Sequence, residues 1–177
     1  DAFPNDSSQI IDLDNDGYDD ILIGADGEDS LWTDGGAAYI WLGGTVRGTQ
    51  SLSLANTKFV GESDLDYVGY SVAGLGDVNG DGNLDLGFGV LGDDAGATDA
   101  GAAYVALGPF SAGSFAMSDV YARLTAASAN DEAGRSLAPA GDFNNDGFDD
   151  ILVGAPGEDY GGTDAGAAFV TFGALSW

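Results

Sequence analysis

Three acidic stretches with one pattern decide the architecture of this chain. They read DLDNDGYDDILIGA at residues 12–25, DVNGDGNLDLGFGV at 77–90 and DFNNDGFDDILVGA at 142–155. A second motif accompanies them, as GAAYIWLG at 36–43, GAAYVALG at 101–108 and GAAFVTFG at 166–173. Both motifs recur every 65 residues without insertion or deletion, so the chain consists of tandem copies of one unit.

The period divides the 177 residues into an incomplete first repeat at 1–47, a second repeat at 48–112 and a third at 113–177, which together form one domain. A four-bladed ring with this period needs about 260 residues, so about 2.7 repeats do not close a ring. We therefore expect the partners of this chain to be further copies of itself or flanking blades of the same protein. The incomplete first repeat predicts a strand supplied from elsewhere.

Short apolar runs between glycine- and aspartate-rich turns predict an all-β fold with about four strands per repeat. The expected strands are 21–24, 37–42, 59–60, 68–75, 84–90, 102–107, 121–124, 134–140, 151–154 and 167–172. One such sheet cannot bury both of its faces, so the sheets must stack on one another. We expect tandem four-stranded antiparallel blades of a β-propeller-like repeat, with the strand aromatics Tyr39, Trp41, Tyr104, Phe169 and Phe172 packed between sheets.

The charge balance excludes several classes of function. Thirty acidic residues face four basic ones, for a net charge of −26, which repels the phosphates of nucleic acids and of anionic membranes. The chain has no cysteine and no histidine, so disulfides, thiolate zinc sites and histidine-based catalytic triads are excluded. No apolar run is long enough to insert into a membrane. Any bound metal must be a hard cation held by oxygen ligands.

The acidic stretches share the loop pattern D-x-[DN]-x-D-G-x-x-D. Alternate side chains in a tight loop can turn their oxygens toward one centre, and the glycine at the sixth position (Gly17, Gly82 or Gly147) allows the bend. The pattern predicts three Ca²⁺ sites, with side-chain ligands at positions 1, 3, 5 and 9 and a backbone carbonyl at position 7. The predicted ligands are Asp12, Asp14, Asp16, Tyr18 and Asp20; Asp77, Asn79, Asp81, Asn83 and Asp85; and Asp142, Asn144, Asp146, Phe148 and Asp150.

Two other interpretations compete for these loops. An EF-hand needs a glutamate at position 12 and flanking helices, but Ile23, Phe88 and Val153 occupy that position within strand-like runs. The second alternative is that the loops are solvated acidic hairpin turns without a metal. The recurrence of the full loop pattern at the same position in three repeats makes this alternative less favourable. A second group of acids follows each strand, at Asp26, Glu28 and Asp29, at Asp93 and Asp94, and at Glu158 and Asp159. Paired acids occur in glycosidases, but acids that recur in every repeat indicate a structural role, because one active site needs a single copy. We therefore expect no enzymatic activity.

The unit resembles the FG-GAP repeat, which forms the blades of the integrin alpha-subunit propeller. The Phe-Gly half of that motif corresponds to Val68-Gly69 and Ala133-Gly134, which keep the glycine. The Gly-Ala-Pro half is complete at Gly154-Ala155-Pro156, partial at Gly24-Ala25-Asp26 and lost at Gly89-Val90-Leu91. The resemblance implies a propeller with calcium in loops at the blade edges, an extracellular or cell-surface location, and a role in adhesion or ligand binding.

These observations predict a calcium-stabilised extracellular β-repeat module with a structural or adhesive role. Because the blades do not close, copies are expected to join through the incomplete first blade into a ring or a filament. Two alternatives stay open: a ligand-recognition fragment of a larger cell-surface propeller that binds a protein or a glycan, and a calcium-binding accessory domain of an enzyme.

Overall fold

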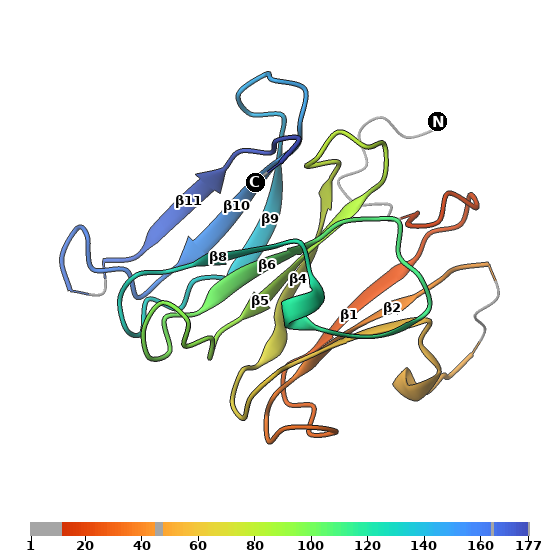
Figure 1. The fold of residues 1–177 in the computed structure, drawn as a ribbon, viewed down its shortest axis with the longest axis horizontal. Coiled ribbons are helices and arrows are strands. Elements are labelled where there is room, and N and C mark those ends of the chain that lie inside the picture. Colours follow the sequence, from red (N-terminus) through yellow and green to blue (C-terminus); the bar gives the residue numbers. More distant parts are fainter. Residues whose placement is uncertain (1–11, 45–47, 164, 177) are drawn as a thin grey trace.

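The computed structural model describes residues 12–44, 48–163 and 165–176 and shows three β-sheets side by side (Figure 1). The first sheet has the order β1 (Ile21–Ala25), β2 (Ala37–Trp41), β3 (Thr57–Val60) and β7 (Gly113–Ala116). The second has the order β4 (Val68–Gly76), β5 (Asp85–Val90), β6 (Ala102–Ala106) and β8 (Ala122–Thr125). The third has the order β11 (Ala167–Thr171), β10 (Asp150–Ala155) and β9 (Ser136–Gly141). The helical turns are η1 (Leu52–Leu54) and η2 (Met117–Asp119), so the predicted all-β fold is confirmed.

The sequence period reappears in the pairing of the strands. Ile23 pairs with Tyr39 in the first sheet, and their counterparts one period later, Phe88 and Tyr104, pair in the second. Val153 and Phe169 repeat this register in the third sheet. The register is the same in all three sheets because the apolar residues recur at the same positions in each repeat. A one-residue slip would turn each apolar side chain to the opposite face of its sheet.

The sheets are offset from the sequence repeats. β3 lies in the second repeat but pairs with β2 of the first, and β8 lies in the third repeat but pairs with β6 of the second. The sheets also differ from the predicted wholly antiparallel, four-stranded pattern. β7 pairs with β3 in parallel, and the third sheet has three strands in the described part of the chain. The β7 sequence GSFA was not predicted as a strand, because glycine, serine and alanine carry no strong strand signal.

Apolar side chains fill the spaces between neighbouring sheets. Ile40 and Phe59 from the first sheet meet Leu86 and Phe88 from the second, with the rings of Phe59 and Phe88 4.7 Å apart between centroids. Leu75, Val105, Ile151 and Val153 form the corresponding core between the second and third sheets. These contacts remove whole side chains from water, which is the main stabilising contribution in a stack of thin sheets.

The predicted burial of the strand aromatics holds for only part of the chain. Tyr39, Trp41 and Tyr104 are buried, as expected. The prediction was wrong for Phe169 and Phe172, which are 46% and 51% exposed. The physical reason is local, because no segment of the described chain covers this end of the third sheet.

Glycine is required where adjacent sheets approach most closely. Gly69 and Gly134, one period apart, have left-handed backbones with φ of +84° and +82°. A Cβ on Gly69 would lie 2.4 Å from the carbonyl oxygen of Ala37, and one on Gly134 would lie 2.2 Å from that of Ala102. These are the glycines of the Phe-Gly half of the motif, and their missing side chain sets the spacing between sheets.

We expect Gly134→Ala to lower the free energy of unfolding by about 2 kcal/mol or more, because it combines an unfavourable φ with a collision against backbone. Gly27→Ala is the matched control, since a Cβ there meets its nearest atom at 3.8 Å. Chemical denaturation of both variants measures the difference. Equal stabilities of the two variants would contradict the proposed close approach.

Candidate metal sites

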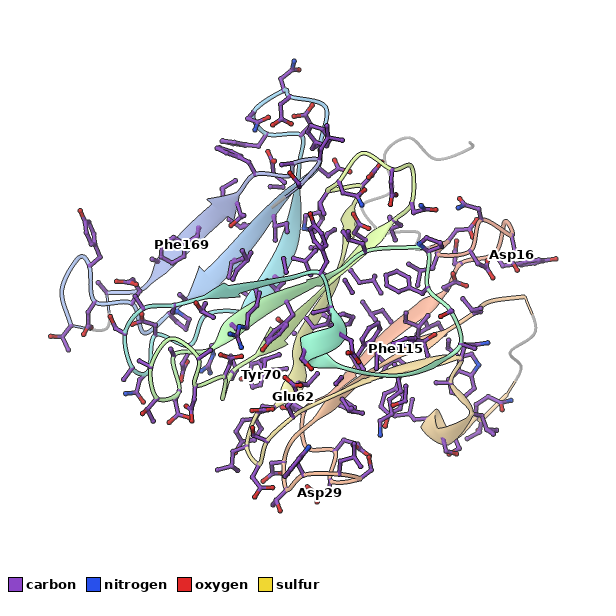
Figure 2. All side chains as sticks on the ribbon, in the orientation of Figure 1. Asp16, Asp29, Glu62, Tyr70, Phe115 and Phe169 are labelled. Atoms are coloured by element: carbon purple, nitrogen blue, oxygen red, sulfur yellow. The ribbon has the colours of Figure 1, made fainter. Side chains whose placement is uncertain are left out.

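The three acidic loops occupy equivalent places in the fold. The first loop (12–20) leads into β1, the second (77–85) connects β4 to β5, and the third (142–150) connects β9 to β10. In Figure 1 the three loops lie along one edge of the molecule, at the corresponding ends of the three sheets. Figure 2 shows Asp16 of the first loop projecting from this edge.

The carboxylate at the first loop position organises each turn. Asp12 accepts hydrogen bonds from the N–H groups of Asp16 and Gly17, both at 3.0 Å. Asp77 and Asp142 accept the equivalent bonds from the fifth and sixth residues of their loops, at 2.8 to 3.0 Å. The three turns therefore share one backbone conformation, in which charge-assisted hydrogen bonds hold an acidic side chain over the loop.

The third and fifth positions complete the turn. The side-chain oxygen at position 3 accepts a hydrogen bond from the N–H of position 5, and the carboxylate at position 5 accepts one from the N–H of position 7. The acceptors are Asp14, Asn79 and Asn144 at position 3, and Asp16, Asp81 and Asp146 at position 5. The position-7 residues, Tyr18, Asn83 and Phe148, are the donors to position 5. Their carbonyl oxygens as metal ligands stay a prediction.

Two loop positions adopt the left-handed backbone conformation. The sixth position was predicted from its glycine, and Gly17, Gly82 and Gly147 have φ of 86°, 86° and 94°. The fourth position was not predicted, although Asn15, Gly80 and Asn145 have φ of 57°, 76° and 61°. Asparagine and glycine are the residues that tolerate this region best, so their recurrence there was the available signal.

The aspartate at the ninth position joins each loop to its sheet. Asp20, Asp85 and Asp150 are 7%, 0% and 0% exposed. Asp85 accepts hydrogen bonds from the N–H of Val78 in its loop and from the N–H of Gly108 beyond β6, both at 2.9 Å. Asp20 accepts the equivalent bonds from the N–H groups of Leu13 and Gly43. Asp150 accepts them from the N–H groups of Phe143 and Gly173.

The glycines that donate these bonds were missed from the sequence. Gly43, Gly108 and Gly173 end the GAAYIWLG-type motif, and each follows its ninth-position aspartate by 23 residues. A Cβ on any of these glycines would lie 2.3 to 2.6 Å from the carbonyl oxygen of the residue before the ninth-position aspartate. Those residues are Asp19, Leu84 and Asp149. The fixed spacing between the two motifs was the signal that these glycines contact the loops.

The second and third loops also contact each other. The N–H of Asp77 donates to Oδ2 of Asp149 at 2.9 Å, and the N–H of Asp149 donates to the carbonyl oxygen of Asp77 at 3.1 Å. Asp149 belongs to the third loop but is not one of its predicted ligands. The conformation of one loop therefore depends on that of its neighbour.

Burial and mutual repulsion perturb the acids in these loops. Burial raises the pKa of Asp85 to about 6, which the hydrogen bonds from Gly108 and Val78 only partly offset. Desolvation and the nearby charge of Asp16 raise the pKa of Asp14. The pKa of Asp81 is lowered, chiefly because the amide of Asn79 donates a hydrogen bond to its carboxylate. Among the described residues, the ion pairs of Lys58, Arg123 and Arg135 all involve acids outside these loops.

The first loop brings together acidic side chains that could hold a metal ion. Oxygens of Asp12, Asp14 and Asp20 all lie within 4.8 Å of one another, and in the described part of the chain no other cluster of three acidic side chains meets this criterion. An all-oxygen donor set suits Ca²⁺, which takes about 6–8 oxygens at about 2.3–2.6 Å. In the second and third loops Asn79 and Asn144 replace the central aspartate, and their amide oxygens are also ligands that calcium accepts.

Comparison with known proteins agrees with this structure. The FG-GAP repeat model matches residues 5–42 and 133–171, which contain the first and third acidic loops. The chain therefore contains FG-GAP repeats, the propeller-like module found in integrin alpha subunits. Such repeats often bind calcium and are typical of extracellular proteins. A comparison with curated proteins gives no significant match. Within residues 12–44, 48–163 and 165–176, no helix has the length and hydrophobicity that crossing a bilayer requires.

The position-9 carboxylate is expected to stabilise the fold even without metal. Asp20→Asn should lower the free energy of unfolding in chelator by about 1–3 kcal/mol, because an amide nitrogen would then face a buried N–H donor. Asp19→Asn makes the same charge change at an exposed neighbour and should alter stability by less than about 0.5 kcal/mol. Urea unfolding of both variants measures this, and similar losses in the two would contradict the role of Asp20.

The raised pKa of Asp85 predicts a pH dependence of the metal-free protein. A folded-state pKa of about 6 lies above the ordinary aspartate pKa of 3.8, so the folded state binds more protons between these values. The stabilisation is present at low pH and is lost as the pH rises through 6. In chelator, the melting temperature should be higher at pH 5 than at pH 7. Asp85→Asn should reduce this difference, and an undiminished difference would contradict the assignment.

Proposed function

We propose that the chain is a calcium-stabilised extracellular β-repeat module with a structural or adhesive role. The observation that carries the proposal is the shared hydrogen-bond network of the three acidic loops, which places oxygen-bearing side chains at the same positions in each. A solvated turn needs no such conformation in every repeat. The recurrence supports one loop geometry for one kind of ligand, and an all-oxygen donor set suits a hard cation.

Each loop would hold one Ca²⁺ through its residues at positions 1, 3, 5 and 9 and the carbonyl at position 7. Bound calcium supplies positive charge where carboxylates repel one another. Three ions would change the formal charge from −26 to −20. Since the position-9 aspartates also bond to the strand-end glycines, ordering of a loop would be transmitted to its sheet.

The expected stabilisation is large relative to the stability of a typical domain. At a free calcium concentration about ten times the dissociation constant, each site contributes about 1.4 kcal/mol. Three sites together contribute about 4 kcal/mol, against a usual free energy of unfolding of about 5–15 kcal/mol. Sites in extracellular modules often bind at about 10⁻⁴–10⁻³ M, a range that suits calcium outside cells.

A non-catalytic role is part of this proposal. The sequence has no histidine and no cysteine, and the loop acids with shifted pKa values, Asp14, Asp81 and Asp85, also accept hydrogen bonds that form the turns. The partners we propose are flanking blades or further copies, because the stacking cores continue from sheet to sheet and the third sheet exposes apolar side chains such as Phe169 and Phe172. A protein or glycan ligand would then bind an assembled propeller.

Calorimetric titration with calcium tests the proposal. We expect three bound Ca²⁺ per chain and a melting temperature raised by roughly 8–16 °C at ten times the dissociation constant. Asp77→Ala should leave two ions bound. Asp26→Ala, which removes an exposed acid outside the loops, should leave three. Absence of calcium binding, or melting that chelator does not change, would contradict the proposal.

A further inference from the structure

We propose that the outer edge of β8 and the groove beside it accept an extended, uncharged peptide strand with the small–aromatic–small pattern of β7. The proposal rests on the internal repeat and not on calcium binding. The equivalent edge one period earlier is covered by such a strand, whereas the edge of β8 has no strand on it in the described part of the chain.

The covered edge shows what the strand does. β7 pairs in parallel with β3, so that Phe115 lies opposite Phe59 with the ring centroids 5.7 Å apart. Thr57 donates a hydrogen bond from Oγ1 to the carbonyl oxygen of Ser111 at 2.9 Å, just before the strand. Figure 1 shows this segment leaving the second sheet, crossing toward the first and returning through a helical turn. Figure 2 places Phe115 near the first sheet.

The turn after β7 closes the space between the two sheets. Met117 of η2 is 2% exposed and belongs to the core formed by the first and second sheets. Tyr104 of β6 lies in the same core and is 5% exposed. One segment therefore does two things: it extends a sheet through backbone hydrogen bonds, and it inserts an apolar side chain between sheets.

The edge of β8 is the counterpart of that covered edge. A shift of one period converts Lys58 and Phe59 of β3 into Arg123 and Leu124 of β8, so the charge and the apolar contact are both retained. Beside β8 lies a groove of about 580 Å³ between the second and third sheets. Its lining is mostly apolar, with Leu124, Ala126, Ala133, Val153 and Phe169, and it also includes the charged residues Arg123 and Glu158.

Exposure of one aromatic ring marks the difference between the two places. Phe169 of β11 is the counterpart of Tyr104, but it is 46% exposed where Tyr104 is 5% exposed. Figure 2 shows Phe169 on the third sheet, away from the segment that carries Phe115. An aromatic side chain of this size loses a large contact area when it is left in water. Tyr104 lies in β6, which β8 flanks, whereas β11 has no outer strand in the described part of the chain, and Phe169 also lines the groove beside β8. The groove therefore offers an exposed aromatic ring at the place where β7 and η2 cover its counterpart one repeat earlier.

The chemistry of the occupant follows from the groove and from the net charge. An unpaired strand edge binds backbone of any sequence, and the adjoining apolar wall selects an aromatic or methionine side chain. The β7 strand, GSFA, is uncharged and small except for Phe115. The net charge of −26 disfavours an acidic strand at this edge. In a second copy the β7 strand is already paired with β3 of its own chain, so the occupant proposed for this edge is a separate peptide strand.

A synthetic peptide with the sequence of residues 109–118, PFSAGSFAMS, blocked at both ends so that it is uncharged, is the probe. Titrated into the calcium-loaded chain, it should bind and shift the amide resonances of Ala122–Thr125. Phe169→Asp should weaken binding by about tenfold or more, because it removes the aromatic ring from the groove and adds a carboxylate to that of Glu158. Leu152→Asp is the matched control on the opposite face of the third sheet and should bind as the unmodified chain does. Melting curves verify that both variants are folded.

Backbone methylation of the probe tests strand pairing itself. Neighbouring N–H groups of a strand point to opposite edges, so methylation at Ser114 and at Phe115 should affect binding differently, with one probe weakened and the other not. Equal effects would overturn the strand geometry. Shifts on β3 in place of β8, or self-association of the chain that buries β8 without added peptide, would overturn the proposed site or its occupant. Peptide binding that persists in chelator would support this inference even if the proposed calcium sites proved wrong.

Discussion

The buried aspartate at the ninth loop position is the contact on which the rest of the structure depends. In each repeat it joins an N–H of the acidic loop to the N–H of a glycine beyond the next strand. One carboxylate thus fixes the start of β1, β5 or β10 relative to the end of the strand that follows. A buried carboxylate satisfied by two backbone donors is favourable only in that geometry, so it specifies the loop and the sheet together.

This arrangement concentrates negative charge at one edge of the molecule. The loops use their acids as hydrogen-bond acceptors, yet four basic residues cannot neutralise thirty acidic ones. The structure resolves part of the repulsion through N–H donors, as at Asp12, and part through the amide of Asn79, which lowers the pKa of Asp81. The remaining charge explains why a divalent cation is the ligand proposed for these loops.

Much of the fold and of the loop geometry could be predicted because the sequence repeats itself. The 65-residue period predicts most of the strands, the three equivalent acidic loops and the stacking of the sheets. The parallel strand β7 could not be predicted, since its pairing with β3 depends on tertiary contact and its residues carry weak strand propensity. Exposure of Phe169 was missed for a related reason, because a strand pattern shows which side chains can be buried but not what covers them.

The most direct test is amide hydrogen exchange at Gly43, Gly108 and Gly173, measured in calcium and in chelator. These N–H groups connect the loops to the sheets. If calcium orders the loops through the ninth-position aspartates, exchange at all three glycines should slow when calcium is bound. Exchange rates that are the same in calcium and in chelator would contradict the account.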